Sequence, residues 1–349
     1  MRTIGKTIQV ALTYIGTIVG AGFATGQEIL QFFTRYGWMA TATIGLATVL
    51  FIWLGVNIML LANEVGARSY EDLNRQLFGG RAGTWISRFT LVILLGTTIV
   101  MLAGAGSLLR EHLGVPIQLG LISTMLLTYV LLLKGMDAIM AVNTIVVPVM
   151  LTFSVMIVAA TSGTAGANNW LTLTSDYPIH QIWFSPLLYV AFNLAMAQAV
   201  LVPLGSAMEN RRVLIWGGIL GGLGIGALLL ACHYALSARL PGIAAFEIPM
   251  GHLIARLGRP LQLLYIAMIF SEIFTTFLGN VYGLSLQLHH YMRIPRNGII
   301  AIVLLVCYLV GQIGFSRLLS FLYPLFGLVS LCWFVFLLIG SRNWRAGKA

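Results

Sequence analysis

Charged residues are scarce in this sequence. Only 9% of its 349 residues are Asp, Glu, Lys or Arg, whereas 59% are hydrophobic. Soluble globular domains carry about 25% charged residues, and no soluble fold of this size could hide so much apolar surface from water. The composition therefore excludes a water-soluble protein and predicts a chain whose solvent is lipid.

Cysteines and clusters of basic residues are also few. The three cysteines, Cys232, Cys307 and Cys332, lie inside apolar runs and have neither metal-ligand nor disulfide spacing. The formal net charge is +10, but the basic residues are not clustered as a nucleic-acid interface requires. No pattern indicates a metal site or a catalytic nucleophile. We therefore expect no nucleic-acid partner, no enzymatic activity and no cofactor, apart from a sodium ion argued for below.

What the sequence has in abundance is long apolar runs. A helix needs roughly 20 residues to cross roughly 30 Å of hydrocarbon. The runs predict an all-α membrane protein with about ten transmembrane helices in a single domain, residues 1–349. The predicted spans are 7–36, 39–61, 85–109, 117–133, 137–160, 181–205, 212–237, 259–287, 297–314 and 318–340.

The distribution of basic residues predicts the orientation. If the N-terminus is inside, six of the 20 Lys and Arg residues lie on the outer side, namely Arg35, Arg110, Arg239, Arg256, Arg259 and Arg317. The other 14 lie on the inner side. The positive-inside rule therefore places both termini in the cytoplasm of a multi-pass protein of the cell membrane.

The spacing of the spans predicts an internal repeat. Spans two and seven start at residues 39 and 212, which are 173 residues apart, and spans three and eight start 174 residues apart. The longest predicted loops, 62–84 and 238–258, follow equivalent spans. Each unit, residues 7–160 and 181–340, has five spans, so the second unit enters the membrane upside down. Inverted repeats of this kind recur in secondary transporters.

The first span carries four glycines in its middle, followed by the polar residues Gln27 and Glu28. The glycines are Gly16, Gly20, Gly22 and Gly26. Glycine weakens a helix by up to about 1 kcal/mol relative to alanine, and the pattern predicts a break that exposes N–H groups for an anion and C=O groups for a cation. The alternative is an unbroken helix with glycines for close packing. A similar cluster in the seventh span, Gly217 to Gly226, indicates packing alone.

Glu28 has two interpretations. Thr25-Gly26-Gln27-Glu28 fits a capping box, in which Glu28 ties down the first turn of the outer half-helix. Alternatively, Glu28 binds or relays a cation or a proton. Both interpretations require the helix to restart near Thr25, so both favour the break.

Polar residues in spans six and eight are further candidates. Asn193 lies mid-membrane in span six, where Tyr189 and Phe192 are expected to form an aromatic wall beside a solute. The alternative is that Asn193 bonds a neighbouring helix and the aromatic residues belong to the core. In span eight a polar face consists of Glu272, Thr275, Thr276 and Asn280. Such a face looks into the helix bundle, either toward a solute or toward hydrogen bonds between helices.

The stretch Gly20-Ala21-Gly22-Phe23-Ala24-Thr25-Gly26-Gln27-Glu28, together with Tyr189-x-x-Phe192-Asn193, resembles the YkvI-like membrane proteins. These are grouped with amino acid permeases in the amino acid-polyamine-organocation superfamily. The resemblance covers nearly the whole chain. It implies a LeuT-type fold of five plus five inverted helices, with breaks in spans one and six.

The resemblance also implies a solute site between the two breaks, flanked by spans three and eight. The candidate solute-binding residues are Gly20, Ala21, Gly22, Phe23, Thr25, Gly26, Glu28, Tyr189, Phe192, Asn193, Glu272 and Asn280. The candidate coupling-ion residues are Gly16, Val19, Gly20, Thr275 and Thr276. Some proton-coupled members carry a lysine in span five, where this chain offers only Asn143 and Thr144, which favours sodium over a proton.

The predicted function is secondary active transport of a small polar solute, such as an amino acid, across the lipid bilayer. The alternative is a permease-like sensor, which binds the solute without moving it. No catalytic cluster favours a membrane enzyme. Glu28 and Glu272 keep proton coupling open as the alternative to sodium.

Overall fold

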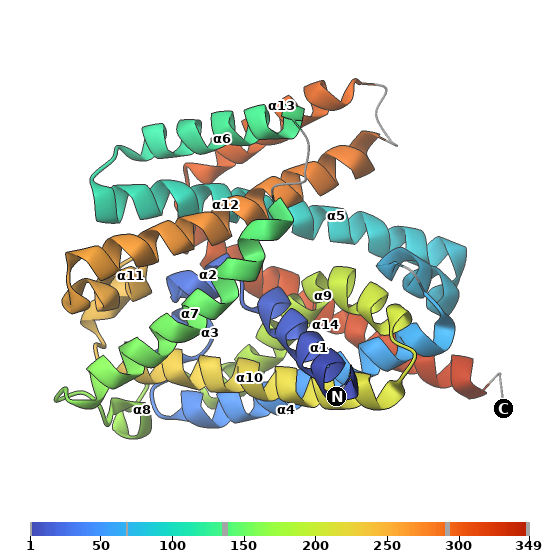
Figure 1. Ribbon diagram of the computed structural model, residues 1–349, viewed down its shortest axis with the longest axis horizontal. Helices are drawn as coiled ribbons and strands as arrows, with labels where there is room; N and C mark the ends of the chain where they lie inside the picture. Colours follow the sequence, from blue (N-terminus) through green and yellow to red (C-terminus); the bar gives the residue numbers. More distant parts are fainter. Residues whose placement is uncertain (1, 68, 135–138, 290–293, 347–349) are drawn as a thin grey trace.

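The computed structural model describes residues 2–67, 69–134, 139–289 and 294–346, and every regular element in these ranges is a helix (Figure 1). The long helices and the segments of the first span are α1 (Arg2–Ile18), α2 (Ala21–Thr25), α3 (Gln27–Phe32), α4 (Met39–Val65), α5 (Tyr70–Leu113), α6 (Ile117–Lys134), α7 (Ile139–Ser162), α9 (Ile179–Ala207), α10 (Arg211–Ser237), α12 (Arg259–His289), α13 (Arg296–Gly311) and α14 (Phe315–Ala346). The short connecting helices are η1 (Thr34–Tyr36), α8 (Asn169–Thr172), η2 (Gly242–Ala245), α11 (Pro249–Ile254) and η3 (Ala255–Leu257).

Six of the described helices are long and apolar enough to cross a membrane. They are α4, the Arg88–Leu113 part of α5, α9, α10, α12 and the Phe315–Phe336 part of α14. Three shorter apolar helices comprise Ile117–Leu132, Pro148–Ser162 and Arg296–Gly311. Each predicted span therefore coincides with one helix or, for the first span, with α1 followed by the short segments α2, α3 and η1. The prediction of an all-helical membrane protein with several spans is confirmed.

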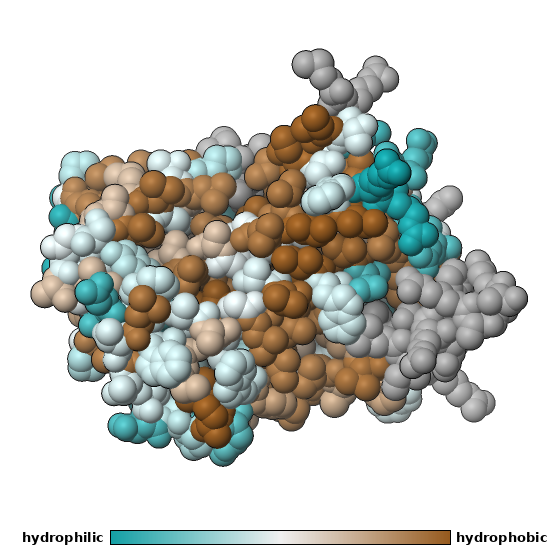
Figure 2. All heavy atoms as spheres, turned by 90° about the horizontal axis from the view of Figure 1, so that it is seen from below, coloured by the Kyte–Doolittle hydropathy of each residue, from teal (hydrophilic) through white to brown (hydrophobic). Residues whose placement is uncertain are grey.

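The surface has the pattern that a bilayer requires. Large hydrophobic side chains are exposed along the outsides of the long helices, for example Trp53, Leu126, Val155 and Phe321. Figure 2 shows hydrophobic residues gathered over the middle of one face, with hydrophilic residues toward its two ends. The long axis of the molecule therefore runs approximately across the membrane. The orientation of the termini stays a prediction, and Met1 and residues 347–349 lie outside the described residues.

One predicted loop is largely helical. The prediction that residues 62–84 form a long loop is wrong, because α4 continues to Val65 and α5 begins at Tyr70. The Ser69 hydroxyl accepts a hydrogen bond from the Asp72 N–H at 3.1 Å, which caps the new helix. Gly79 has φ 78° and ψ 170° and kinks the helix before its membrane-crossing part. The polar composition of this stretch concealed its helical start signal.

The predicted break in span six is also wrong. Helix α9 runs without interruption from Ile179 to Ala207, with Pro186 and Pro203 toward its two ends. No glycine lies between these prolines, so no residue in the interior favours leaving the helix. The Asn193 side chain donates to the Tyr189 carbonyl at 3.0 Å within the same helix. Asn193 thus bonds its own helix, rather than a neighbouring one as the alternative proposed.

The glycines of α10 pack against α1 and α4, which confirms the packing interpretation of Gly217 to Gly226. A Cβ atom at Gly221 would overlap the ring of Tyr14, and one at Gly222 would overlap Ile52. The Tyr14 hydroxyl crosses to α4 and donates to the Phe51 carbonyl at 2.7 Å. These close approaches fix α1, and hence the first break, against the rest of the bundle.

Candidate functional site

The first span is broken twice. Helix α1 ends at Ile18, and Gly20 is extended with φ −106° and ψ −161° before α2 begins. Gly26 separates α2 from α3 with φ 81°, in the left-handed region that favours glycine. The predicted break is confirmed, and the alternative of an unbroken packing helix is wrong.

Thr25 stabilises the second break, but not as a capping box. Its hydroxyl donates to the Gly22 carbonyl at 2.8 Å and accepts from the Gln27 N–H at 3.3 Å. The N-cap of α3 is Gly26, which has no side chain, and no side-chain hydrogen bond caps the helix. The capping-box interpretation is therefore wrong, because the left-handed Gly26 takes the position that the motif assigned to Thr25. The Glu28 carboxylate does not serve this helix end.

Glu28 is buried between three parts of the bundle. Its residue is 5% exposed, and its carboxylate lies close enough to the hydroxyls of Tyr189 and Tyr323 to interact electrostatically. A Cβ atom at Gly22 would overlap this carboxylate. Gly22 therefore provides the space that the Glu28 side chain occupies, folded back against the break.

Among the described residues, Glu28 forms no ion pair. The salt bridges found among the described residues join Arg211 to Glu64 and His252 to Glu111. A carboxylate buried without a basic partner is costly in a bilayer. The site therefore favours a bound cation, a ligand ammonium group or a proton at Glu28.

Aromatic rings enclose Tyr189 beside the break. Its ring centroid lies 5.3 Å from that of Phe32, 5.0 Å from that of Phe33 and 6.1 Å from that of Phe51. The ring of Phe192 packs against that of Tyr323, with 4.4 Å between the ring centroids. The structure thus brings both predicted aromatic residues to the break, where they are buried as part of the core in this conformation.

Three hydroxyl-bearing residues that the sequence analysis did not select hold the broken segment in place. The Tyr265 hydroxyl donates to the Ala24 carbonyl at 2.9 Å, and the Ser185 hydroxyl donates to the Phe32 carbonyl at 2.7 Å. The Gln27 amide donates to the Ser316 hydroxyl at 2.7 Å. These residues come from α12, α9 and α14, and isolated hydroxyls give no sequence signal that would identify them.

The polar face of α12 is only partly assigned. Glu272 and Thr275 are buried, and the Thr275 hydroxyl bonds the Glu272 carbonyl at 3.3 Å. Asn280 donates to the Thr97 hydroxyl on α5 at 3.4 Å, as the inter-helix alternative predicted. Helix α12 packs against α2, but the predicted ion site between Gly16–Gly20 and Thr275–Thr276 stays a prediction. The side chains of Asn143 and Thr144 lie outside the described residues.

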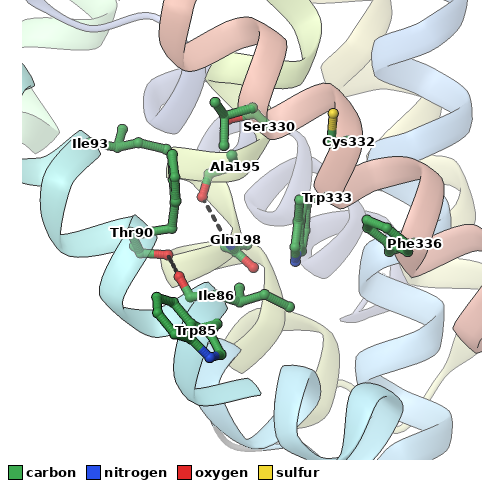
Figure 3. Close-up of a pocket in the computed structure, with 12 residues that line it drawn as sticks. Trp85, Ile86, Thr90, Ile93, Ala195, Gln198, Ser330, Cys332, Trp333 and Phe336 are labelled. Atoms are coloured by element: carbon green, nitrogen blue, oxygen red, sulfur yellow. Dashed lines mark hydrogen bonds between the residues drawn. The ribbon is translucent and has the colours of Figure 1, made fainter. Parts of the chain in front are cut away.

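A cavity of about 220 Å³ lies apart from the break, between α5, α9 and α14 (Figure 3). Its wall is mostly apolar and includes Trp85, Trp333 and Phe336, while Gln198 and Ser330 contribute polar atoms. Among the described residues, the buried Gln198 Oε1 and Ser330 Oγ atoms have no hydrogen-bond partners. None of the predicted solute-binding residues lines this cavity, so it is not the predicted site.

The fold defines the class of protein. It is similar to the inward-facing conformation of Mhp1, with TM-score 0.67 and 15% identity over 93% of this chain and 73% of that chain. It is also similar to MhsT in complex with L-phenylalanine, with TM-score 0.66 and 12% identity over 95% of this chain and 86% of that chain. The chain is thus a multi-pass membrane protein with the fold of LeuT-type transporters.

The sequence comparisons identify the family. The chain is 39% identical to the uncharacterized membrane protein YkvI of Bacillus subtilis (strain 168) over 94% of each chain. It is 26% identical to the uncharacterized protein YyaD of the same organism over 94% of this chain and 95% of the relative. No family model matches the chain. The protein belongs to the YkvI family.

Proposed function

We propose that this protein is a secondary active transporter of a small polar solute, an amino acid or a related compound, which works by ion-coupled alternating access. The observation that carries the proposal is Glu28, which is buried at a double helix break and has no ion-pair partner among the described residues. Its carboxylate suits the ammonium group of a solute. The carboxylate of a solute, which carries the opposite charge, has a different partner in the backbone near Glu28.

That partner is the first turn of α2. The first hydrogen bond of this helix joins the Ala24 N–H to the Gly20 carbonyl. The backbone N–H groups of Ala21, Gly22 and Phe23 come before it in the chain and therefore have no acceptor within the helix. Unpaired N–H groups at a break attract a carboxylate. An α-amino acid carries both charges on adjacent atoms, so N–H groups and Glu28 within one short segment complement it.

The packing of the helices supports an inverted repeat, an architecture on which many alternating-access transporters are built. Helix α1 packs on α10 as α9 packs on α4, and α5 packs on α6 as α12 packs on α13. These pairs are equivalent if residues 7–160 and 181–340 are the two units. The similarity to MhsT, solved with L-phenylalanine, and to Mhp1, described as a nucleobase-cation-symport-1 transporter, supports a small solute.

A sensor that binds the solute without moving it is the second candidate. The buried Glu28 and the N–H groups at the break that have no acceptor within the helix account for binding of a solute and do not by themselves require its movement. The two candidates share the solute site and differ in whether solute crosses the membrane. A flux measurement separates them.

The coupling ion is testable by binding alone. We propose sodium, held by carbonyl oxygens of Gly16 to Gly20 and by the hydroxyls of Thr275 and Thr276. Sodium should raise the melting temperature of the purified protein in the presence of a bound amino acid, because a ligand of the native state stabilises it. Thr275→Ala should weaken this sodium dependence, whereas Glu272→Gln should preserve it.

The opposite pattern would assign coupling to protons. In that case binding would ignore sodium and follow pH, and Glu28→Gln or Glu272→Gln would abolish the pH dependence. A screen of amino acids by thermal shift, each with and without sodium at several pH values, covers both outcomes.

A further inference from the structure

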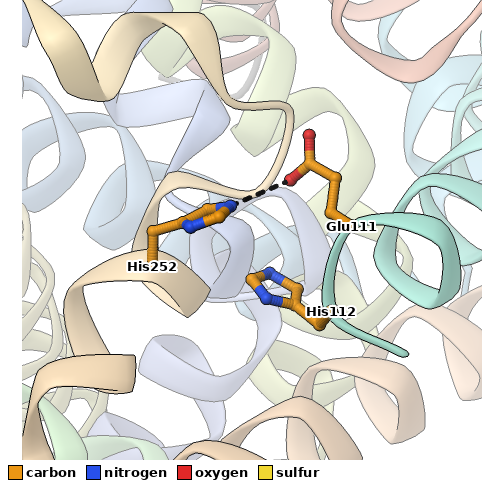
Figure 4. Close-up of side chains that lie close together, drawn as sticks. All are labelled: Glu111, His112 and His252. Carbon is orange, nitrogen blue, oxygen red and sulfur yellow. Dashed lines mark ion pairs between the residues drawn. The ribbon is translucent and has the colours of Figure 1, made fainter. Parts of the chain in front are cut away.

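A second group of chemically active side chains lies away from the helix break. Glu111 and His112 end helix α5, and His252 lies on α11 in the segment between α10 and α12 (Figure 4). One ligand atom of each lies within 4.8 Å of the others. We call these three residues the outer cluster, because the predicted orientation places this end of the molecule outside. Figure 1 shows α11 at the end opposite the C-terminus.

Glu111 is held in position by backbone donors. Its Oε1 accepts from the Glu247 N–H at 2.7 Å, and its Oε2 accepts from the Ile248 N–H at 3.0 Å. Each carboxylate oxygen keeps a further lone pair. The His252 Nε2 lies 3.6 Å from Oε2, close to the spacing of about 3.4 Å between two ligands bound tetrahedrally at roughly 2.1 Å.

Each imidazole has a ring nitrogen placed to act as a ligand atom. Among the described residues, the buried Nε2 atoms of His112 and His252 form no hydrogen bond, while His252 Nε2 lies within ion-pair distance of Glu111. The two ring centroids lie 4.8 Å apart. His112 hydrogen-bonds the Ile248 backbone, which leaves Nε2 to carry the lone pair. A hydrogen bond of this kind fixes the ring orientation of metal-binding histidines. Burial lowers the pKa of His252, and the nearby Glu111 carboxylate partly offsets this by raising it. The ring of Phe246 stacks on that of His252, with 3.6 Å between the ring centroids.

We propose that the outer cluster binds a divalent transition-metal ion, represented by Zn²⁺, through one oxygen of Glu111 and one nitrogen each of His112 and His252. Two imidazoles and one carboxylate form an established zinc donor set, in which water occupies the fourth position. Arg259 is a nearby cation that opposes binding. The Glu111 carboxylate supplies the negative charge that offsets it.

A bound metal would link α11, which lies over the helix break, to the end of α5. Helix α11 packs on α2, and a Cβ atom at Gly26 would overlap Met250 of α11. Helix α11 therefore covers the break on this side, and a metal that bridges Glu111 and His252 holds the cover closed. Binding itself is independent of the proposed transport, whereas the effect on solute access rests on it.

Calorimetric titration of the purified full-length protein with ZnCl₂ tests binding directly. We expect one ion per chain at micromolar affinity or tighter. His252→Ala and Glu111→Gln should each weaken binding at least tenfold, whereas the control His180→Ala, an exposed histidine elsewhere in the predicted outer segment, should leave it unchanged. Titration with Co²⁺ should give visible absorption bands of a tetrahedral site, which His252→Ala abolishes.

The proposal is overturned if the wild-type protein shows no saturable Zn²⁺ binding below about 100 μM, or if His252→Ala and His180→Ala bind with equal affinity. His252→Gln retains size and polarity, and a metal-free melting temperature equal to that of the wild type shows that it is folded. Folded His252→Gln that still binds at wild-type affinity also overturns it. These results hold whether or not the protein transports a solute.

Discussion

At the scale of the residue, Gly22 and Glu28 form one unit. The carboxylate occupies the volume where a Gly22 side chain would be. A glycine here is needed for space, since Gly22 lies within α2 and does not have a positive φ. Any side chain at this position must displace Glu28 from the hydroxyls of Tyr189 and Tyr323.

We therefore predict that Gly22→Ala abolishes or weakens amino acid binding at least tenfold. The new methyl group displaces the Glu28 carboxylate and removes the partner of the solute ammonium. The measurement is a binding isotherm for the amino acid that the thermal-shift screen identifies. Gly45→Ala is the matched control, because a Cβ atom there meets no atom within 4 Å. Equal affinity in both variants contradicts the assignment of Glu28 to the site.

Sequence reasoning predicted the break and left two interpretations of Glu28 open, of which the capping box at Thr25 is wrong. Gly20 and Gly26 stand at the two interruptions, as their weak helix propensity indicated. The capping box failed because the left-handed conformation of Gly26 moves the start of α3 by one residue. The outer cluster was missed because His252 is 140 residues from His112, and only the tertiary fold brings them together.

At the scale of the element, the first span (α1 to α3) and the sixth span (α9) differ despite the symmetry expected of them. Both hold polar residues at mid-membrane, but only the first span has glycines there, and only the first span breaks. The prediction of a break in α9 came from the LeuT-type fold that the resemblance implied. The sequence of α9 itself, which has no glycine between Pro186 and Pro203, indicated a continuous helix. The connection from α4 to α5 shows the reverse error, because a polar composition concealed a capped helix.

The glycine face of α10 gives a prediction about stability. Gly222→Ala should lower the free energy of unfolding by about 1–3 kcal/mol, because the methyl group overlaps Ile52 on α4 and overpacking of a close interface carries such a cost. The melting temperature in detergent measures the loss. Gly45→Ala again serves as control and should be neutral or slightly stabilising. No difference between the two variants would mean that α4 and α10 pack less closely than described.

At the scale of the whole molecule, the all-helical class and the presence of several membrane spans followed from hydropathy alone. Each apolar run could be identified as a span from its own length and hydropathy, because the thickness of the bilayer sets the length of a span. The arrangement of the spans did not follow in this way. The repeat came from spacing, and the fold was confirmed only when the helices were seen to match LeuT-type transporters over 93% and 95% of the chain.

The central claim is that solute crosses the membrane, and uptake into sealed vesicles tests it most directly. Purified protein is reconstituted in liposomes with an inward sodium gradient, and a mixture of radiolabelled L-amino acids is added outside. We predict accumulation above the external concentration, which collapses when an ionophore dissipates the gradient and which is absent with Gly22→Ala. Saturable binding of an amino acid to the same protein, with no accumulation under a sodium or a proton gradient, would contradict the account and assign the protein to the sensors.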